Sequence, residues 1–146
     1  MRFSLVDHLA AVDLARCFLG RSRSQSDVHW LAGTLERCNQ SFQSDGDSGF
    51  QWIIAHAMCL FHELDNNSNV TALACLCISA KLLDDRCAEI GDGVWETQLP
   101  GLTPRALAEA EQSVLHAFAY KVRRKMCVVE TCFENMAISA GVAVCV

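Results

Sequence analysis

The segment Val70–Leu83, VTALACLCISAKLL, constrains the fold more than any other part of this chain. Written as a helix, it is small and apolar nearly all the way round and has no charged residue before Lys81. Such a helix has no face to present to water, so other elements must surround it. The sequence therefore predicts a globular domain centred on Val70–Leu83, with at least three or four other helices packed around it.

Amphipathic segments before and after this centre supply the surrounding helices. In them apolar residues recur at steps of three and four, the spacing of one face of an α-helix. Thr103 and Pro104 form a helix start, because threonine is a good N-cap and proline suits the first helical position. The predicted helices are Ser4–Leu19, Val28–Cys38 with Asp27 as its N-cap, Phe50–Leu64, Val70–Leu83, one that begins at Pro104, and about Arg124–Ala140.

Two segments between these helices have a different character. Ser41–Gly49, SFQSDGDSG, carries turn-forming residues throughout and predicts a loop. Cys87–Gly101 is less regular and has room for a short helix over Ala88–Glu96. No segment has the pattern of a strand, so the expected fold class is all-α.

Length and charge exclude several classes of partner. A chain of 146 residues suits about one domain. Seventeen acidic against twelve basic residues give a formal charge of −5, which disfavours a nonspecific grip on nucleic acid. The longest nearly apolar runs, Val70–Ala80 and Met136–Val146, are about half the ~20 residues that a bilayer span needs. We therefore expect neither nucleic acid nor a membrane among the partners.

The first residues and the cysteines bear on the compartment. Asp7, His8 and Asp13 interrupt what would be the apolar core of a signal peptide, so secretion is not expected. The nine cysteines are odd in number and mostly sit in apolar stretches, where free cysteine acts as a small buried hydrophobe. Both features predict a reducing, intracellular compartment, cytoplasmic or nuclear.

No local motif points to an enzyme, a cofactor or a metal. The chain has no GxGxxG, Walker-type GxxxxGK, HExxH, GxSxG or CxxC sequence. Cys75 and Cys77 lie about 200° apart around a helix, so they cannot close on one metal by themselves. A histidine, namely His56, His62 or His116, could still meet a cysteine in space as a nucleophile pair, and this alternative stays open.

Two charged features each allow two interpretations. Lys81 ends a helix that should be buried, so its ammonium group either reaches past the apolar surface to water or has a partner. The cluster Lys121–Lys125, with Arg123 and Arg124 inside it, is either a solvated helix end or a contact for a phosphate or an acidic partner.

The central segment resembles part of a known family. Ala72–Arg86, ALACLCISAKLLDDR, is similar to the third helix of a cyclin box, where a small apolar run ends in Ala-Lys, two bulky apolar residues and an acidic pair. Ala108–Val122, AEAEQSVLHAFAYKV, is similar to the fifth helix of the same box. The two segments occur in the matching order and spacing, and the LLDDR ending is closest to the single-box, phosphate-pathway-like P-type cyclins.

This resemblance implies a division of the chain and a set of site residues. It places a cyclin-like five-helix box at 27–122, with an N-terminal helix and connector at 1–26 and a C-terminal helix and tail at 123–146. In cyclins, the lysine that ends the third helix and the glutamate that opens the fifth help to hold the regulatory helix of the kinase. These positions correspond to Lys81 and Glu111, and the acidic pair Asp84 and Asp85 completes the partner-binding candidates.

The leading hypothesis is a non-catalytic regulatory subunit that binds and activates a cyclin-dependent protein kinase. A second hypothesis is a cyclin-fold adaptor that binds a peptide or a transcription partner. The third is an enzyme that depends on a Cys/His pair and would need a thiol of low pKa. No cofactor is expected under the first two hypotheses.

Overall fold

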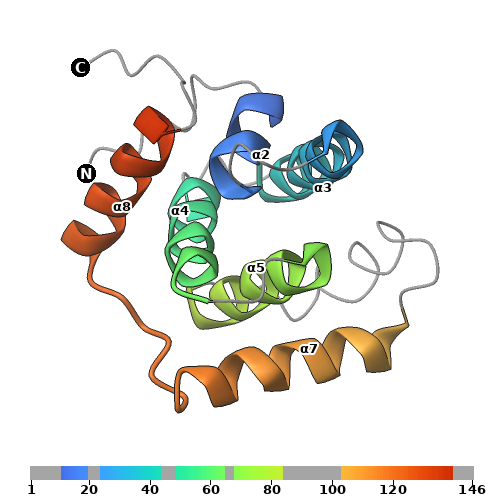
Figure 1. Ribbon diagram of the computed structural model, residues 1–146, viewed down its shortest axis with the longest axis vertical. Helices are drawn as coiled ribbons and strands as arrows, with labels where there is room; N and C mark the ends of the chain where they lie inside the picture. Colours follow the sequence, from blue (N-terminus) through green and yellow to red (C-terminus); the bar gives the residue numbers. More distant parts are fainter. Residues whose placement is uncertain (1–10, 20–23, 44–48, 65–67, 84–102, 140–146) are drawn as a thin grey trace.

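A computed structural model describes residues 11–19, 24–43, 49–64, 68–83 and 103–139, and every regular element in these ranges is an α-helix (Figure 1). The all-α class is therefore confirmed for the described part of the chain. The helices are α2 (Ala11–Leu19), α3 (Gln25–Gln43), α4 (Gly49–His62), α5 (Asn69–Leu83), α7 (Pro104–Ala117) and α8 (Met126–Ser139).

Helix α5 is the buried centre that the sequence predicts. All ten residues from 71 to 80 are buried, including Leu76 at 1% and Ile78 at 7% exposure. The helix packs mainly against α4 on one side and α7 on another (Figure 1). Its small residues let these neighbours approach closely, because alanine and cysteine side chains add little bulk between helix axes.

A second layer of packing joins α2, α3 and α8 to α4. Helix α2 packs on α3, and α8 packs on both α4 and α2. The rings of Phe18 on α2 and Phe61 on α4 lie 5.3 Å apart between centroids, in a tilted arrangement. His62 Nε2 donates a hydrogen bond of 2.8 Å to the carbonyl of Phe18, which satisfies a carbonyl group at the end of α2. The contact between the two rings and the hydrogen bond from His62 together hold α2 against α4.

The start of α7 agrees with the sequence prediction, and the start of α3 differs from it. Thr103 Oγ1 accepts a hydrogen bond from the Ala106 amide, and Pro104 follows it, so the predicted cap of α7 is confirmed. The predicted N-cap Asp27 is wrong. Ser24 Oγ accepts the amide of Asp27, so the helix starts at Gln25. Ser24 caps the helix because its hydroxyl group lies three residues before the Asp27 amide, which has no acceptor within the first turn of the helix.

The predicted loop Ser41–Gly49 is too long at both ends. Helix α3 continues to Gln43, and α4 already begins at Gly49. Turn-forming residues are weak evidence at the edges of a helix, where packing overrides their local preference. The possible short helix over Ala88–Glu96 lies outside the described residues.

Among the described helices, none is long and apolar enough to cross a membrane.

Candidate functional site

The candidate site lies where the end of α5 meets the middle of α7. Lys81 is in the last turn of α5, whereas Glu111 is halfway along α7 and does not open that helix as the resemblance implies. The two helices pack directly against each other, so two residues that are thirty positions apart in the sequence share one surface.

Lys81 and Glu111 form a two-point contact. The ammonium nitrogen Nζ lies 3.1 Å from Glu111 Oε1 and 3.2 Å from Oε2. The sequence allowed the Lys81 ammonium group either to reach water or to have a partner. In the structure it does both. The proximity expected for the two residues is therefore found, while their role in binding a partner stays a prediction.

The two members of the pair differ in their exposure. The side chain of Lys81 is 56% exposed, whereas that of Glu111 is 15% exposed. The carboxylate is therefore largely covered and held by the lysine, while the ammonium group still faces water. The ammonium group is therefore the more accessible of the two charged groups.

An apolar hollow adjoins the ion pair. Its volume is about 480 Å³, and its walls come from the end of α5, one flank of α7 and the segment after α7. The residues that line it are Ile78, Lys81, Leu82, Ala108, Glu111, Gln112, Leu115 and Val122. The α7 members recur at steps of three and four, so they form a single flank of the helix. The surface can therefore accept an apolar group next to a charged one.

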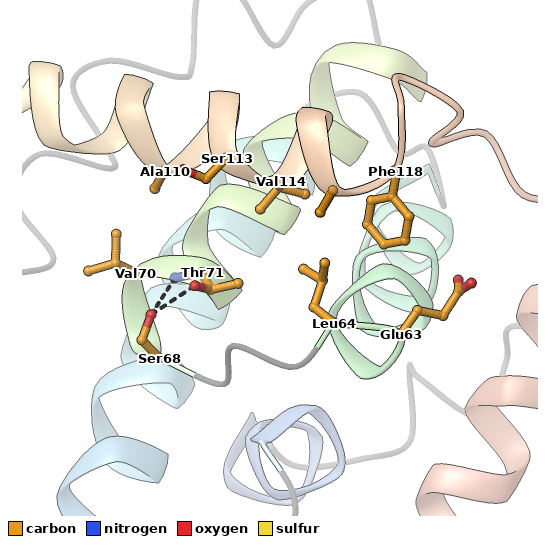
Figure 2. Close-up of a pocket in the computed structure, with 10 residues that line it drawn as sticks. Glu63, Leu64, Ser68, Val70, Thr71, Ala110, Ser113, Val114 and Phe118 are labelled. Carbon is orange, nitrogen blue, oxygen red and sulfur yellow. Dashed lines mark hydrogen bonds between the residues drawn. The ribbon is translucent and has the colours of Figure 1, made fainter.

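A second hollow lies on the opposite flank of α7 (Figure 2). It has a volume of about 470 Å³ and is bounded by the end of α4, the start of α5 and α7. Ser68 Oγ, at its edge, accepts the amide of Thr71 and lies 2.8 Å from the Thr71 hydroxyl. These hydroxyl groups are thus already engaged in capping α5. Phe118 and Leu64 supply the apolar wall at the other end (Figure 2).

The basic cluster Lys121–Lys125 contains a residue that binds within the domain. Arg124 Nε donates to Glu63 Oε2 at 2.9 Å, and its guanidinium group lies 5.0 Å from the centre of the Phe118 ring. Arg124 also donates to the carbonyl of Lys121 at 2.7 Å. Sequence reasoning missed this role, because Glu63 lies sixty-one positions away. Arg124 is therefore held by contacts within the domain. The sequence had suggested either a solvated helix end or a contact with an outside partner.

Three candidate histidines bind groups other than a cysteine thiol. His56 is hydrogen-bonded to Ser79 and to the Arg124 amide, His62 donates to a backbone carbonyl, and His116 lies 3.4 Å from the Tyr120 hydroxyl. Within the described ranges, no three His, Cys, Asp or Glu residues gather in a way that could hold a metal ion. The Cys/His nucleophile pair stays a prediction.

Asp84 and Asp85, the other two partner-binding candidates, lie outside the described residues. The site therefore consists of Lys81, Glu111 and the apolar hollow beside them. Sequence reasoning named the charged pair but not the hollow, although the lining residues Ala108, Leu115 and Val122 lie in a segment quoted for its family resemblance.

Comparison of the chain with models of protein families, with curated proteins and with solved structures gives no match.

Proposed function

We propose that this domain is a non-catalytic regulatory subunit that docks a cyclin-dependent protein kinase through the surface around Lys81 and Glu111. The observation that carries the proposal is the ion pair itself, with Nζ and Oε1 3.1 Å apart beside an apolar hollow. A lysine that ends the central helix and a glutamate on a neighbouring helix meet at the surface, as the resemblance to a cyclin box implies.

The chemistry of this surface suits the docking of a protein segment. An apolar side chain can fill the hollow, while the Lys81 ammonium group binds a backbone carbonyl or a carboxylate at its rim. Interfaces of this kind concentrate their energy in a few residues that are shielded from water by the contacts around them. The mechanism is allosteric, because the domain would hold the regulatory helix of the kinase in its active arrangement and contribute no catalytic group.

The first test measures kinase binding by calorimetry. Lys81→Ala and Glu111→Ala should each weaken binding by about 2 kcal/mol or more, and the double variant should lose less than the sum, because the two residues act as one unit. The fold should survive, since an ion pair with an exposed member contributes only about 0–1 kcal/mol to stability. Circular dichroism checks the fold of each variant.

The chain offers a matched control on the same helix. Arg105 and Glu109 form an ion pair of 3.3 Å on α7 that is exposed on both sides and does not line the hollow. Arg105→Ala should leave kinase binding unchanged. Unchanged affinity in Lys81→Ala, Glu111→Ala and the double variant would remove the reason for calling this surface a kinase-docking site.

The adaptor hypothesis rests on the same hollow and is separated by a different readout. An adaptor would bind a peptide or a transcription partner without changing the activity of any kinase. Kinase activity measured with and without the domain therefore decides between the two functions. Activation that is lost in Lys81→Ala supports the regulatory subunit.

A further inference from the structure

The chain reverses direction after α7 through two strained residues. Ala119 and Tyr120 have φ angles of 51° and 64°, in the left-handed region that residues with a Cβ atom rarely adopt. The Tyr120 amide donates to the Leu115 carbonyl at 2.8 Å, which turns the chain back at the end of the helix. Two strained residues in succession persist only where the surrounding structure holds them. The contacts on either side of the reversal therefore decide where the next segment lies.

Arg124 contacts the residues on both sides of this reversal. Its guanidinium carbon lies 5.0 Å from the centre of the ring of Phe118, which directly precedes the strained pair. Its Nη1 donates at 2.7 Å to the carbonyl of Lys121, which directly follows the pair. One planar side chain thus holds the two ends of the reversal together.

Arg124 is itself attached to the region of α4 at two points. Its Nε and Nη2 donate to Glu63 Oε2 and Oε1 at 2.9 and 3.3 Å, a two-pronged contact that fixes the plane of the guanidinium group. Its backbone amide donates to His56 Nε2 at 3.2 Å. The side chain is only 18% exposed, so it is largely shielded from water. The position of α4 is therefore passed on, through Arg124, to the segment that follows α7.

The peptide unit that Arg124 holds belongs to the wall of the apolar hollow. The Lys121 carbonyl and the Val122 amide are parts of one planar unit. Val122 is 8% exposed and lines the hollow beside Lys81 and Glu111. Arg124 is not one of the lining residues. Since Val122 lies outside the helices, its place in the wall depends on the contacts of its own segment.

We propose that Arg124 is a positioning residue for the docking surface, and that it holds the Lys121–Val122 peptide unit so that Val122 closes the hollow. This role rests on the proposed function for the use of the hollow, whereas the position of its wall can be measured without any partner. A lysine in place of Arg124 keeps the charge beside Glu63. It lacks the planar fork that reaches Glu63 and the Lys121 carbonyl at the same time.

The first test follows amide hydrogen exchange and methyl signals in the free domain by NMR. Arg124→Met keeps an apolar stem and the backbone bond to His56, but removes every guanidinium donor. The Lys121 amide, which donates to the Phe118 carbonyl, should exchange about tenfold faster, and the methyl signals of Val122 should shift. Arg124→Lys should behave nearly like Arg124→Met.

Two controls separate positioning from a general loss of stability. Arg105→Ala removes an exposed arginine from α7 and should change neither measurement. The amide of Leu76 in the buried helix α5 reports on unfolding of the whole domain, so its exchange should respond much less than that of Lys121. Unchanged Val122 signals in Arg124→Met, or equal acceleration at Lys121 and Leu76, would overturn the proposal.

A second test measures kinase binding in a double-variant cycle. Arg124→Met should weaken binding by about tenfold in the unaltered chain and have little further effect once Val122→Ala is present, because the side chain that it positions has been removed. Effects that simply multiply would show that Arg124 does not act through Val122. If Lys81→Ala and Glu111→Ala leave binding unchanged while Arg124→Met still shifts the Val122 signals, the proposed function fails and the positioning of the wall stands.

Discussion

The imidazole ring of His56 on α4 and the hydroxyl group of Ser79 on α5 are 2.8 Å apart, and both residues are fully buried. The other ring nitrogen, Nε2, accepts the backbone amide of Arg124 at 3.2 Å. Since Nε2 is an acceptor, the proton lies on Nδ1, which donates to Ser79. This bond joins the two most buried helices and ties them to the segment that leads into α8.

The protonation of His56 should make the domain sensitive to acid. Burial, with the nearby charges of Arg124 and Arg123, lowers the pKa of His56 from 6.5 to about 4. The unfolded chain takes up the proton below about pH 6.5, whereas the folded chain resists it until about pH 4. The free energy of unfolding should therefore fall across this interval, by up to about 3 kcal/mol in total. Urea unfolding at a series of pH values measures the loss.

A control separates this residue from other groups that titrate in acid. A variant with Gln at position 56 should show a smaller loss over the same interval. An equal loss in that variant would show that groups other than His56 cause the acid sensitivity.

Removal of the Ser79 hydroxyl group should show how much its hydrogen bond with His56 contributes to the free energy of unfolding. Ser79→Ala leaves the Nδ1 proton of His56 buried without its acceptor, and an unpaired buried donor costs about 1–3 kcal/mol. Ser113→Ala is the matched control, because Ser113 is an exposed helical residue on α7. It should change the free energy of unfolding by less than about 0.5 kcal/mol. Equal effects of the two substitutions would contradict the role assigned to the buried bond.

The central helix should be intolerant of truncation. Leu76→Ala and Ile78→Ala each remove buried methyl groups from α5 and should cost about 2–5 kcal/mol as internal cavities form. Ile138→Ala, on α8, removes a side chain that is 64% exposed and should have little effect. Chemical unfolding measures all three. A loss below about 1 kcal/mol at both central positions would show that α5 is not the core of the domain.

The cap of α7 should contribute to stability in a way that depends on its hydroxyl group. Thr103→Ala removes the acceptor of the Ala106 amide and should destabilise the domain by about 1 kcal/mol. Thr103→Ser keeps the hydroxyl and should retain most of the stability. A similar loss in both variants would mean that the methyl group of Thr103, rather than its hydrogen bond, is what matters.

The sequence predicted the parts of this fold that depend on local pattern. The burial of α5 follows from its lack of a polar face, and the start of α7 follows from Thr103 and Pro104. The start of α3 was missed by three residues, because both Ser24 and Asp27 are good caps and only the hydrogen bond chooses between them. The cyclin-like arrangement of five helices stays a prediction.

The candidate site was less accessible to sequence reasoning than the fold. Lys81 and Glu111 entered through a family resemblance, and periodicity alone gives no reason to join them across thirty positions. The contacts of Arg124 with Glu63 and of His56 with Ser79 were not predicted at all. Each depends on how two helices approach each other, and a helical pattern fixes the face of a helix but not the partner that this face meets.

The packing of α8 on α2 and α4 has a consequence for the making of the protein (Figure 1). A ribosome builds the chain from its amino end, so α2, α4 and α5 leave the exit tunnel before α8 has been synthesised. During that interval, the face of α4 that packs against α8 is open to the surrounding solution. We expect the nascent chain to hold this apolar surface uncovered until residue 139 has emerged, and therefore to need protection from aggregation at that stage of translation.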